Sequence, residues 1–408
     1  MTGPQFSVVI PTRNRAHLLG SALATLRAQT WDDFEVVVSD NASGDDTRGV
    51  ATAHDDGRVR YVRSDRALRQ HDSWEFGVDH ARGEWITVLG DDDGLVPSAL
   101  ERLASVTAGA GTSPVVWRDV WYYDPVFPPV WLGPGEANGL TVWPFSGRVD
   151  SLDSATAVDA VFRMIPQRLP GFYDACVHRD TVARVRGRLG RVFGDPDPFV
   201  SSGIAVALHE PKIVTFDLPL MVRGFSDATL SLNFVRNTRA AHEGVEEFDT
   251  EDLFILAPLR ERTLATLVAE TLLRLKGVLP DELAGHDLDL VAYFRQVRDE
   301  VDAPKRRPDG GAAVAEWKQV LSHQPSAVRR AVRSQLLKRH AVGVAKRVAG
   351  RVPGALALAT RRRRSAGYWS AFQWTHGDEA GFKDLPGAAA WFDGAALPPP
   401  AERTASAA

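Results

Sequence analysis

The sequence predicts an α/β protein with a mostly parallel sheet flanked by helices, followed by a mainly helical C-terminal region. Over the first 117 residues, short β-branched and apolar runs alternate with helical patterns. Polar clusters at residues 11–14, 40–46 and 90–94 follow three of those runs, where ligands bind in such sheets. After about residue 235, Arg- and Ala-rich helical patterns replace the strand-like runs.

Four apolar runs are expected to form the strands of this sheet, and they are Phe6–Ile10, Phe34–Val38, Val59–Val62 and Trp85–Leu89. The near-continuous apolar character of the first two is typical of strands that are covered on both faces. Turn-forming residues 40–46 follow the second run, and Gly90-Asp-Asp-Asp-Gly94 follows the fourth. A further strand-like run is Ile213–Phe216.

Three helices are expected to connect or follow these strands. The first carries Leu19, Leu23 and Leu26 on one stripe. The second covers about Asp72–Ala81, and the third runs to Val106 after Pro97, a residue that suits the first turn of a helix. This strand–helix alternation predicts crossover connections with helices on both faces of the sheet.

Composition excludes several classes of protein. The 408 residues include 48 Lys+Arg and 52 Asp+Glu, a net charge of −4, so the chain as a whole is not a polyanion binder. The single Cys176 excludes an intramolecular disulfide framework and a multi-cysteine zinc site. The N-terminus lacks the pattern of a secretory signal, and no run approaches 18 apolar residues, so we expect a cytoplasmic protein.

The chain is expected to divide near residue 235. Residues 1–235 would form the α/β domain, residues 236–396 a helical, basic region, and residues 397–408 a disordered tail. Within the first part, residues 117–145 combine eight aromatic residues with five prolines, which predicts an irregular loop or an edge hairpin. These aromatic side chains could stack on an acceptor molecule or pack under the loop, and the sequence leaves both open.

The cluster Asp91-Asp92-Asp93 is the strongest indication of chemistry in the sequence. Three carboxylates at a strand end repel one another unless a cation or hydrogen-bond donors lie among them. Mg²⁺ and Mn²⁺ take one or two carboxylates and fill the other positions with phosphates and water. The cluster therefore indicates a metal–diphosphate site, against the alternative of a solvated acidic turn.

The two other polar clusters indicate a nucleotide. Asp40 and Asn41 could bond a base or a ribose, and Pro11, Thr12 and Arg13 could offer backbone groups and a cation. The alternatives are an ordinary turn at 40–41 and helix capping by Thr12.

Three segments together resemble family-2 glycosyltransferases of the GT-A fold. They are Phe6-Ser-Val-Val-Ile-Pro-Thr-Arg-Asn-Arg15, the segment Phe34–Thr47 with Ser39-Asp-Asn-Ala-Ser43, and Gly83-Glu-Trp-Ile-Thr-Val-Leu-Gly-Asp-Asp-Asp93. The resemblance covers about residues 5–105 and weakens towards 230.

The resemblance implies a role for each of these residues. Thr12 and Arg13 would line the nucleotide pocket, Asp40 would hold the base, and Asp91 would lie at the ribose. Asp92 matches the metal-binding carboxylate, and Asp93 is a second candidate because Gly90 stands where the family usually has an acid.

The implied reaction is an inverting, metal-assisted transfer from a nucleoside-diphosphate sugar, with UDP as the expected nucleotide, to a hydroxyl of a glycan, lipid-linked or small-molecule acceptor. A carboxylate base would deprotonate that hydroxyl. The family's base lies about a hundred residues beyond the aspartate cluster, which points to Asp197 first and Asp195 second, although Asp-Pro pairs are also ordinary turn formers. The alternatives are a silent nucleotide-sugar- or membrane-binding module and a nucleotidyltransferase of similar fold.

The C-terminal region contains a basic stretch at residues 318–364. Between Trp317 and Gly377 there are 13 Lys+Arg and no acidic residue. A solvated helix face, peripheral contact with an anionic membrane on its inner side, and polyanion binding are the three interpretations. An apolar stripe that includes Val328, Val332 and Leu336 favours a packed or membrane-lying helix and disfavours a nucleic-acid arm.

Overall fold

The computed structural model describes residues 3–53, 57–125, 137–165, 168–226, 229, 253–301, 310–349 and 373–398. The expected disordered tail lies outside these residues from position 399 onward, as do residues 126–136 of the aromatic segment. Residues 350–364 of the basic stretch lie outside them as well.

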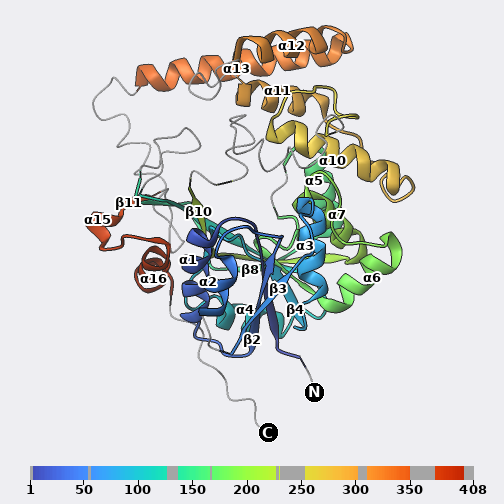
Figure 1. Ribbon diagram of the computed structural model, residues 1–408. Helices are drawn as coiled ribbons and strands as arrows, with labels where there is room; N and C mark the ends of the chain where they lie inside the picture. Colours follow the sequence, from blue (N-terminus) through green and yellow to red (C-terminus); the bar gives the residue numbers. More distant parts are fainter. Residues whose placement is uncertain are drawn as a thin grey trace.

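The N-terminal half alternates strands and helices as the sequence predicts (Figure 1). Its elements in chain order are β1 (Phe6–Thr12), α1 (Ala16–Arg27), β2 (Phe34–Asp40), α2 (Thr47–Ala53), β3 (Val59–Arg63), α3 (Gln70–Asp79), β4 (Trp85–Val88), β5 (Gly94–Leu95) and α4 (Ala99–Thr107). Strands β1 and β2 run two residues further than expected, up to the polar residues Thr12 and Asp40. They do so because they pair with each other in parallel along their full length.

The middle of the chain contributes β6 (Val115–Tyr123), β7 (Gly139–Val142), β8 (Val149–Asp153), α5 (Ser154–Phe162), β9 (Ala175–His178), α6 (Arg179–Leu189), α7 (Pro198–His209) and β10 (Lys212–Phe225). The order of strands across the sheet is β11-β7-β6-β9-β4-β1-β2-β3, and β10 pairs with β5, β6 and β8. Strands β1 to β4 are mutually parallel, and β9 lies antiparallel between β4 and β6. The predicted fold class is therefore confirmed, with a mostly parallel sheet flanked by helices.

The aromatic segment takes the second of its two expected forms, a hairpin, although β11 pairs with its outer strand β7. Strands β6 and β7 form the antiparallel pair of a hairpin. Trp117, Tyr122, Tyr123 and Phe145 are buried, so for these four side chains the packing interpretation holds. Phe127 and Trp131 lie outside the described residues.

Two hydrophobic clusters cover the two faces of β1 and its neighbours. On one face, Val8 and Ile10 pack in a cluster with residues of α1, α4 and α16. On the other face, Val9 packs in a cluster with residues of α3, α6 and α7. Successive side chains of β1 point to opposite faces of the sheet, and a separate layer of helices covers each face.

The C-terminal region is mainly helical, as predicted. Its described residues form α10 (Leu264–Val278), α11 (Leu290–Val301), α12 (Gly310–Ser322), α13 (Ser326–Ala349), β11 (Gln373–His376), α15 (Gly377–Ala380) and α16 (Leu385–Ala396). In Figure 1, α12 and α13 lie at the top, beyond α11, whereas α16 lies beside the sheet. The stripe residues Val328, Val332 and Leu336 pack in the cluster of this helical part, with Val332 fully buried. None of the described helices combines the length and the apolarity that a membrane span requires.

Candidate active site

The carboxyl ends of β1 and β2 form one continuous edge. The Asn41 amide donates to the Thr12 carbonyl at 2.9 Å. Asn14 joins the two following loops, because its amide donates to Ser43 Oγ at 3.0 Å and its Oδ1 accepts from the Gly44 amide at 2.7 Å. Two of the polar clusters singled out from the sequence therefore lie side by side.

Asp40 is fully buried at this edge and its carboxylate is already hydrogen-bonded. It accepts from the Ser43 amide at 2.8 Å, from the Tyr61 hydroxyl at 2.5 Å and from Arg63. Burial alone would raise the pKa of Asp40, but these donors outweigh it and hold the pKa below its usual value. Asp40 thus ties β2 to β3, and its contact with a nucleobase stays a prediction.

Asn41 fixes the loop between β3 and α3. Its Oδ1 accepts from the Leu68 amide at 2.7 Å, and its Nδ2 donates to the Leu68 carbonyl at 2.9 Å. This paired contact shapes one wall of the sheet edge next to Asp40.

The three aspartates at the end of β4 have different surroundings. Asp91 is buried between two donors of the β1 edge: Thr12 Oγ1 donates to Oδ2 at 2.7 Å, and Arg15 Nη1 donates to Oδ1 at 3.0 Å. The ion pair with Arg15 compensates the buried charge. Asp91 thereby brings Thr12 and Arg15 to the third polar cluster, as a shared nucleotide site requires.

Asp92 is the partly exposed member of the cluster. Thr229 donates to its Oδ2 at 3.0 Å, while Oδ1 has no hydrogen-bonding partner from another described residue. Burial, followed by the charge of Asp91, raises the pKa of Asp92. The side chain lines a pocket of about 240 Å³ between α1 and the end of β10.

Asp93 lies in the interior. It is 1% exposed, accepts from the Gly224 amide at 2.8 Å, and accepts from the Tyr173 hydroxyl. Burial, with the neighbouring charge of Asp92, raises the pKa of Asp93 to about 8. A neutral carboxyl that both neighbours already engage is a poor ligand, so this geometry favours Asp92 over Asp93 as the metal ligand.

Two glycines make the arrangement of the cluster possible. A Cβ at Gly90 would lie 2.4 Å from Asp93 Oδ2, and a Cβ at Gly224 would lie 1.8 Å from the Asp92 carbonyl oxygen. The inward position of Asp93 therefore occupies the space of a side chain at position 90.

The residues at Asp92 fit a divalent cation that is shared with a substrate. No group of three or more His, Cys, Asp or Glu side chains capable of holding a metal occurs in the described part of the chain. A single available carboxylate oxygen nevertheless suits Mg²⁺ or Mn²⁺, which take few protein ligands when substrate phosphates supply the others. The raised pKa of Asp92 agrees with a site where a cation would relieve repulsion between carboxylates.

Asp197 begins α7. Its Oδ1 accepts from the amides of Phe199 and Val200 at 2.9 and 3.1 Å, which makes it the N-cap. Its Oδ2 makes no hydrogen bond to a described residue, and burial raises the pKa of the carboxyl. The cap is the turn-forming role that the sequence offered as the alternative, yet it leaves one oxygen available.

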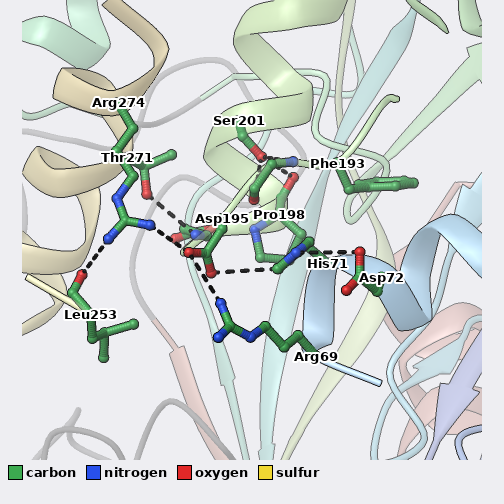
Figure 2. Close-up of polar contacts among 12 residues, drawn as sticks. Arg69, His71, Asp72, Phe193, Asp195, Pro198, Ser201, Leu253, Thr271 and Arg274 are labelled. Carbon is green, nitrogen blue, oxygen red and sulfur yellow. Dashed lines mark hydrogen bonds and ion pairs between the residues drawn. The ribbon is translucent and has the colours of Figure 1, made fainter. Parts of the chain in front are cut away.

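Asp195 lies among two arginines and a histidine (Figure 2). Arg274 Nη1 is 2.5 Å from Oδ2, His71 Nδ1 is 3.4 Å from Oδ1, and Arg69 Nη1 is 4.0 Å from Oδ2. Arg274 comes from α10, so the helical region contacts the loop that carries both candidate bases.

Aromatic rings connect this loop to the aspartate cluster. Phe193 packs edge-to-face on Trp74, with ring centroids 5.5 Å apart, and Trp74 stacks on Tyr173 at 6.1 Å. Tyr173 donates to Asp93, and Arg223 lies 4.7 Å from its ring centre. Arg223 is held in turn by carboxylates of Asp119 and Asp174.

Sequence reasoning did not identify Arg15, Tyr173, Arg223 or Arg274. The partners of these residues lie 76, 80, 104 and 79 positions away in the chain. Only Arg15, inside the first family motif, had a local signal.

Comparison with known proteins supports the resemblance found in the sequence. Residues 7–127 match the profile of the family described as Glycosyl transferase family 2. The resemblance to family-2 glycosyltransferases is thereby confirmed for this segment of the chain.

Three relatives illustrate the range of the match. A GalNAc(5)-diNAcBac-PP-undecaprenol beta-1,3-glucosyltransferase of Campylobacter jejuni is 38% identical over 103 residues, which are 24% of this chain and 33% of that protein. A PGL/p-HBAD biosynthesis glycosyltransferase of Mycobacterium bovis is 36% identical over 123 residues, 29% of this chain and 48% of that protein. A validoxylamine A glucosyltransferase of Streptomyces hygroscopicus is 38% identical over 128 residues, 30% of each chain. The matches span less than half the length of these relatives.

Among solved structures, S. aureus TarS 1-349 in complex with UDP-GlcNAc is similar with a TM-score of 0.46 and 14% identity, covering 82% of this chain and 92% of that one. The mannosyltransferase PcManGT from Pyrobaculum calidifontis, in complex with GDP-Man and Mn²⁺, has a TM-score of 0.43 and 14% identity, covering 88% and 84%.

Proposed function

We propose that this protein is an inverting glycosyltransferase that moves a sugar from a nucleoside-diphosphate donor, expected to be UDP-linked, to an acceptor hydroxyl. The observation that carries the proposal is the convergence of Thr12, Arg15 and Asp91 at one sheet edge, directly beside the partly exposed Asp92. These residues come from the segment that matches glycosyl transferase family 2. The inverting outcome is inferred from the family resemblance.

The donor nucleotide would bind along the edge formed by Pro11–Arg13, Asp40 and Asn41. Thr12 and Arg15 orient Asp91 towards this edge, and Arg13, which follows Thr12 in the chain, would supply a further cation to the donor. Asp92 would hold Mg²⁺ or Mn²⁺ against the donor diphosphate, and the cation would neutralise charge on the leaving group. Asp93 and Tyr173 would act only by keeping Asp92 in place.

Asp197 is the stronger candidate for the base. Its backbone contacts orient the carboxylate through one oxygen, and the other oxygen has no partner among the described residues. The raised pKa makes it a better proton acceptor than an ordinary carboxylate. Asp195, in contrast, is engaged by Arg274 and has the cation of Arg69 4.0 Å away, which weakens it as a base.

The acceptor is inferred from the relatives. The Campylobacter jejuni relative is named for an undecaprenol-diphosphate-linked acceptor, whereas the Streptomyces relative is named for validoxylamine A, a small molecule. We favour a lipid-linked acceptor, because α13 carries exposed basic residues such as Arg330, Arg333 and Lys338 that suit an anionic membrane surface. The protein would then act as a cytoplasmic enzyme at the inner face of the membrane.

The donor site is tested by thermal unfolding with UDP, GDP and dTDP, each with Mn²⁺ or with EDTA. One nucleotide should raise the unfolding temperature of the wild type only with the metal, because ligands stabilise the state they bind. Asp92→Asn should lose this increase, whereas Asp93→Asn should keep it if the protein folds. Absence of any nucleotide effect would reject the enzyme in favour of a module that does not bind donors.

The base is tested by comparing Asp197→Asn with Asp195→Asn. With the donor and the acceptor found by screening, Asp197→Asn should lower kcat by about 100- to 10,000-fold while nucleotide affinity stays unchanged. Asparagine keeps an oxygen for the cap, so α7 should persist. A larger loss of kcat for Asp195→Asn, with an intact fold by circular dichroism, would reverse the assignment.

A further inference from the structure

The pocket beside Asp92 is completed by residues almost 300 positions further along the chain. Its lining includes Ser21 of α1, Asp92, Asp124 and Phe225 at the strand ends, and Lys383 and Asp384 from the segment that precedes α16. Asp91 faces the predicted nucleotide edge through Thr12 and Arg15, and the next residue, Asp92, faces this pocket. The pocket therefore adjoins the nucleotide site.

The segment that supplies Lys383 and Asp384 is firmly held. Strand β11 pairs with β7 over four residues, and the Gly377 amide donates to the Asn138 carbonyl at 2.7 Å. Phe382, next to Lys383, is 2% exposed and its ring centre is 6.1 Å from that of Tyr122. The backbone at 383–384 is thus fixed against the end of β6.

The two side chains themselves are available to a ligand. Asp384 caps α16 through Oδ1, which accepts from the Gly387 amide at 2.8 Å, and its Oδ2 has no hydrogen bond within the described chain. Lys383 is exposed and makes neither a hydrogen bond nor an ion pair with the residues that the structure describes. The Lys383 ammonium group and Asp384 Oδ2 are therefore available to bind a ligand in the pocket.

The chemistry of the lining suits a neutral polyhydroxyl ring. The carboxylates of Asp92, Asp124 and Asp384 outnumber the single ammonium group of Lys383, so an anion without a cation would be repelled. Carboxylates and an ammonium group bond sugar hydroxyls, and Leu18, Pro125 and Leu385 add apolar surface to the lining for C–H groups. A volume of about 240 Å³ is of the size of one sugar ring rather than of a whole nucleotide.

We propose that this pocket holds the hexosyl ring of the donor and that Lys383 and Asp384, from the C-terminal segment, determine which sugar is accepted. The inference rests on the proposed function, since it requires a nucleotide bound at the neighbouring edge. It adds that residues far outside the family-matching segment take part in donor recognition.

The experiment compares affinity for UDP with affinity for UDP-glucose, UDP-galactose and UDP-N-acetylglucosamine by calorimetry with Mn²⁺. Lys383→Ala and Asp384→Asn should each weaken the affinity for the tightest-binding nucleotide sugar roughly tenfold. Each should change the affinity for UDP by less than about twofold. Asparagine retains an oxygen that can cap α16. Lys212→Ala, which removes an exposed lysine from β10, is the matched control and should leave both affinities unchanged.

Three results would overturn parts of the argument separately. An equal loss for UDP and for the nucleotide sugar would assign Lys383 to the diphosphate and reject the sugar pocket. Unchanged affinities for all three nucleotide sugars in both variants would also reject it. A wild type that binds no UDP at all would instead reject the UDP-linked donor of the proposed function, before either variant is measured.

Discussion

Residues 253–349 and residues 373–398 both follow the α/β part of the chain, and they pack on it in different ways. Helices α10 to α13 mostly bury their apolar side chains among themselves and against α5 and α7, in a cluster that includes Tyr293, Phe294 and Trp317. Strand β11 joins the sheet, and Phe392 of α16 enters the cluster that also contains β1 and α1. One part is attached at the side of the sheet, and the other is built into it (Figure 1).

The difference has consequences for the site. The helical part reaches the candidate base loop through α10, where Arg274 bonds Asp195 and the Thr271 hydroxyl accepts from the Asp197 amide at 3.3 Å. The segment 373–398 lines the pocket at Asp92 and contacts α4, because the Ser98 amide donates to Asp393 and Arg102 donates to the Pro398 carbonyl. We therefore expect damage to the second part to disturb the donor site, and damage to the first part to spare it.

The largest expected effect comes from removing one buried ring from each of the two hydrophobic clusters, the one that contains β1 and the one of the helical part. Phe392→Ala removes a fully buried ring that packs against Phe145 and should destabilise the protein by about 3–5 kcal/mol, together with loss of nucleotide binding. Phe294→Ala removes an equally buried ring from the helical part and should lower the stability of that part by a similar amount. Urea unfolding and nucleotide titration would be measured for both. The comparison fails if Phe294→Ala abolishes nucleotide binding under conditions where its α/β part remains folded.

A smaller effect concerns the exposed face of α13. Replacing Arg330, Arg333 and Lys338 by Gln should weaken binding to anionic phospholipid vesicles, at about 1 kcal/mol for each charge near the surface. Co-sedimentation at low salt measures it, with uncharged phosphatidylcholine vesicles as the reference. Lys212→Gln, which removes an exposed charge from β10, should not alter binding. Equal binding of the triple variant and the wild type would place any membrane contact elsewhere.

The smallest expected effect concerns Glu270, which holds residues 256 and 257 against α10. Glu270 is fully buried, accepts from the amides of Leu256 and Ala257 at 2.8 and 2.7 Å, and bonds Arg274 Nε at 2.8 Å. Burial would raise the pKa of Glu270, but the hydrogen bonds outweigh it and hold the pKa below the usual 4.5. At neutral pH, Glu270→Gln should therefore cost about 1–3 kcal/mol.

The sign of the pH dependence follows from that shift. Because the folded-state pKa is depressed, the ionised carboxylate contributes stability above about pH 4.5, and the contribution is lost as the pH falls through the folded-state pKa. The stability difference between wild type and Glu270→Gln should shrink below pH 4.5. If the stability difference between wild type and Glu270→Gln stayed constant from pH 7 to pH 3.5, the ionised carboxylate of Glu270 would not be the stabilising form.

Much of the fold could be predicted because its signals are local. The runs that became β1 and β2 are mostly apolar, and such runs are typical of strands covered on both faces. Strand β11, in contrast, has four residues with no distinctive pattern and exists because its backbone pairs with β7. Pairing between segments so far apart leaves no mark in either local sequence.

The candidate site shows the same division between local and distant information. The sequence by itself determined the strand–helix alternation, the three polar clusters at strand ends, and the acidic triplet 91–93, since these depend on periodicity and residue type. Only the tertiary structure decided that Asp91 meets Thr12 and Arg15, that Asp92 faces a pocket and that Asp93 is buried. It also decided that Lys383 and Asp384 complete that pocket. The physical reason is that adjacent residues of identical type differ only in the burial and the partners that distant segments supply.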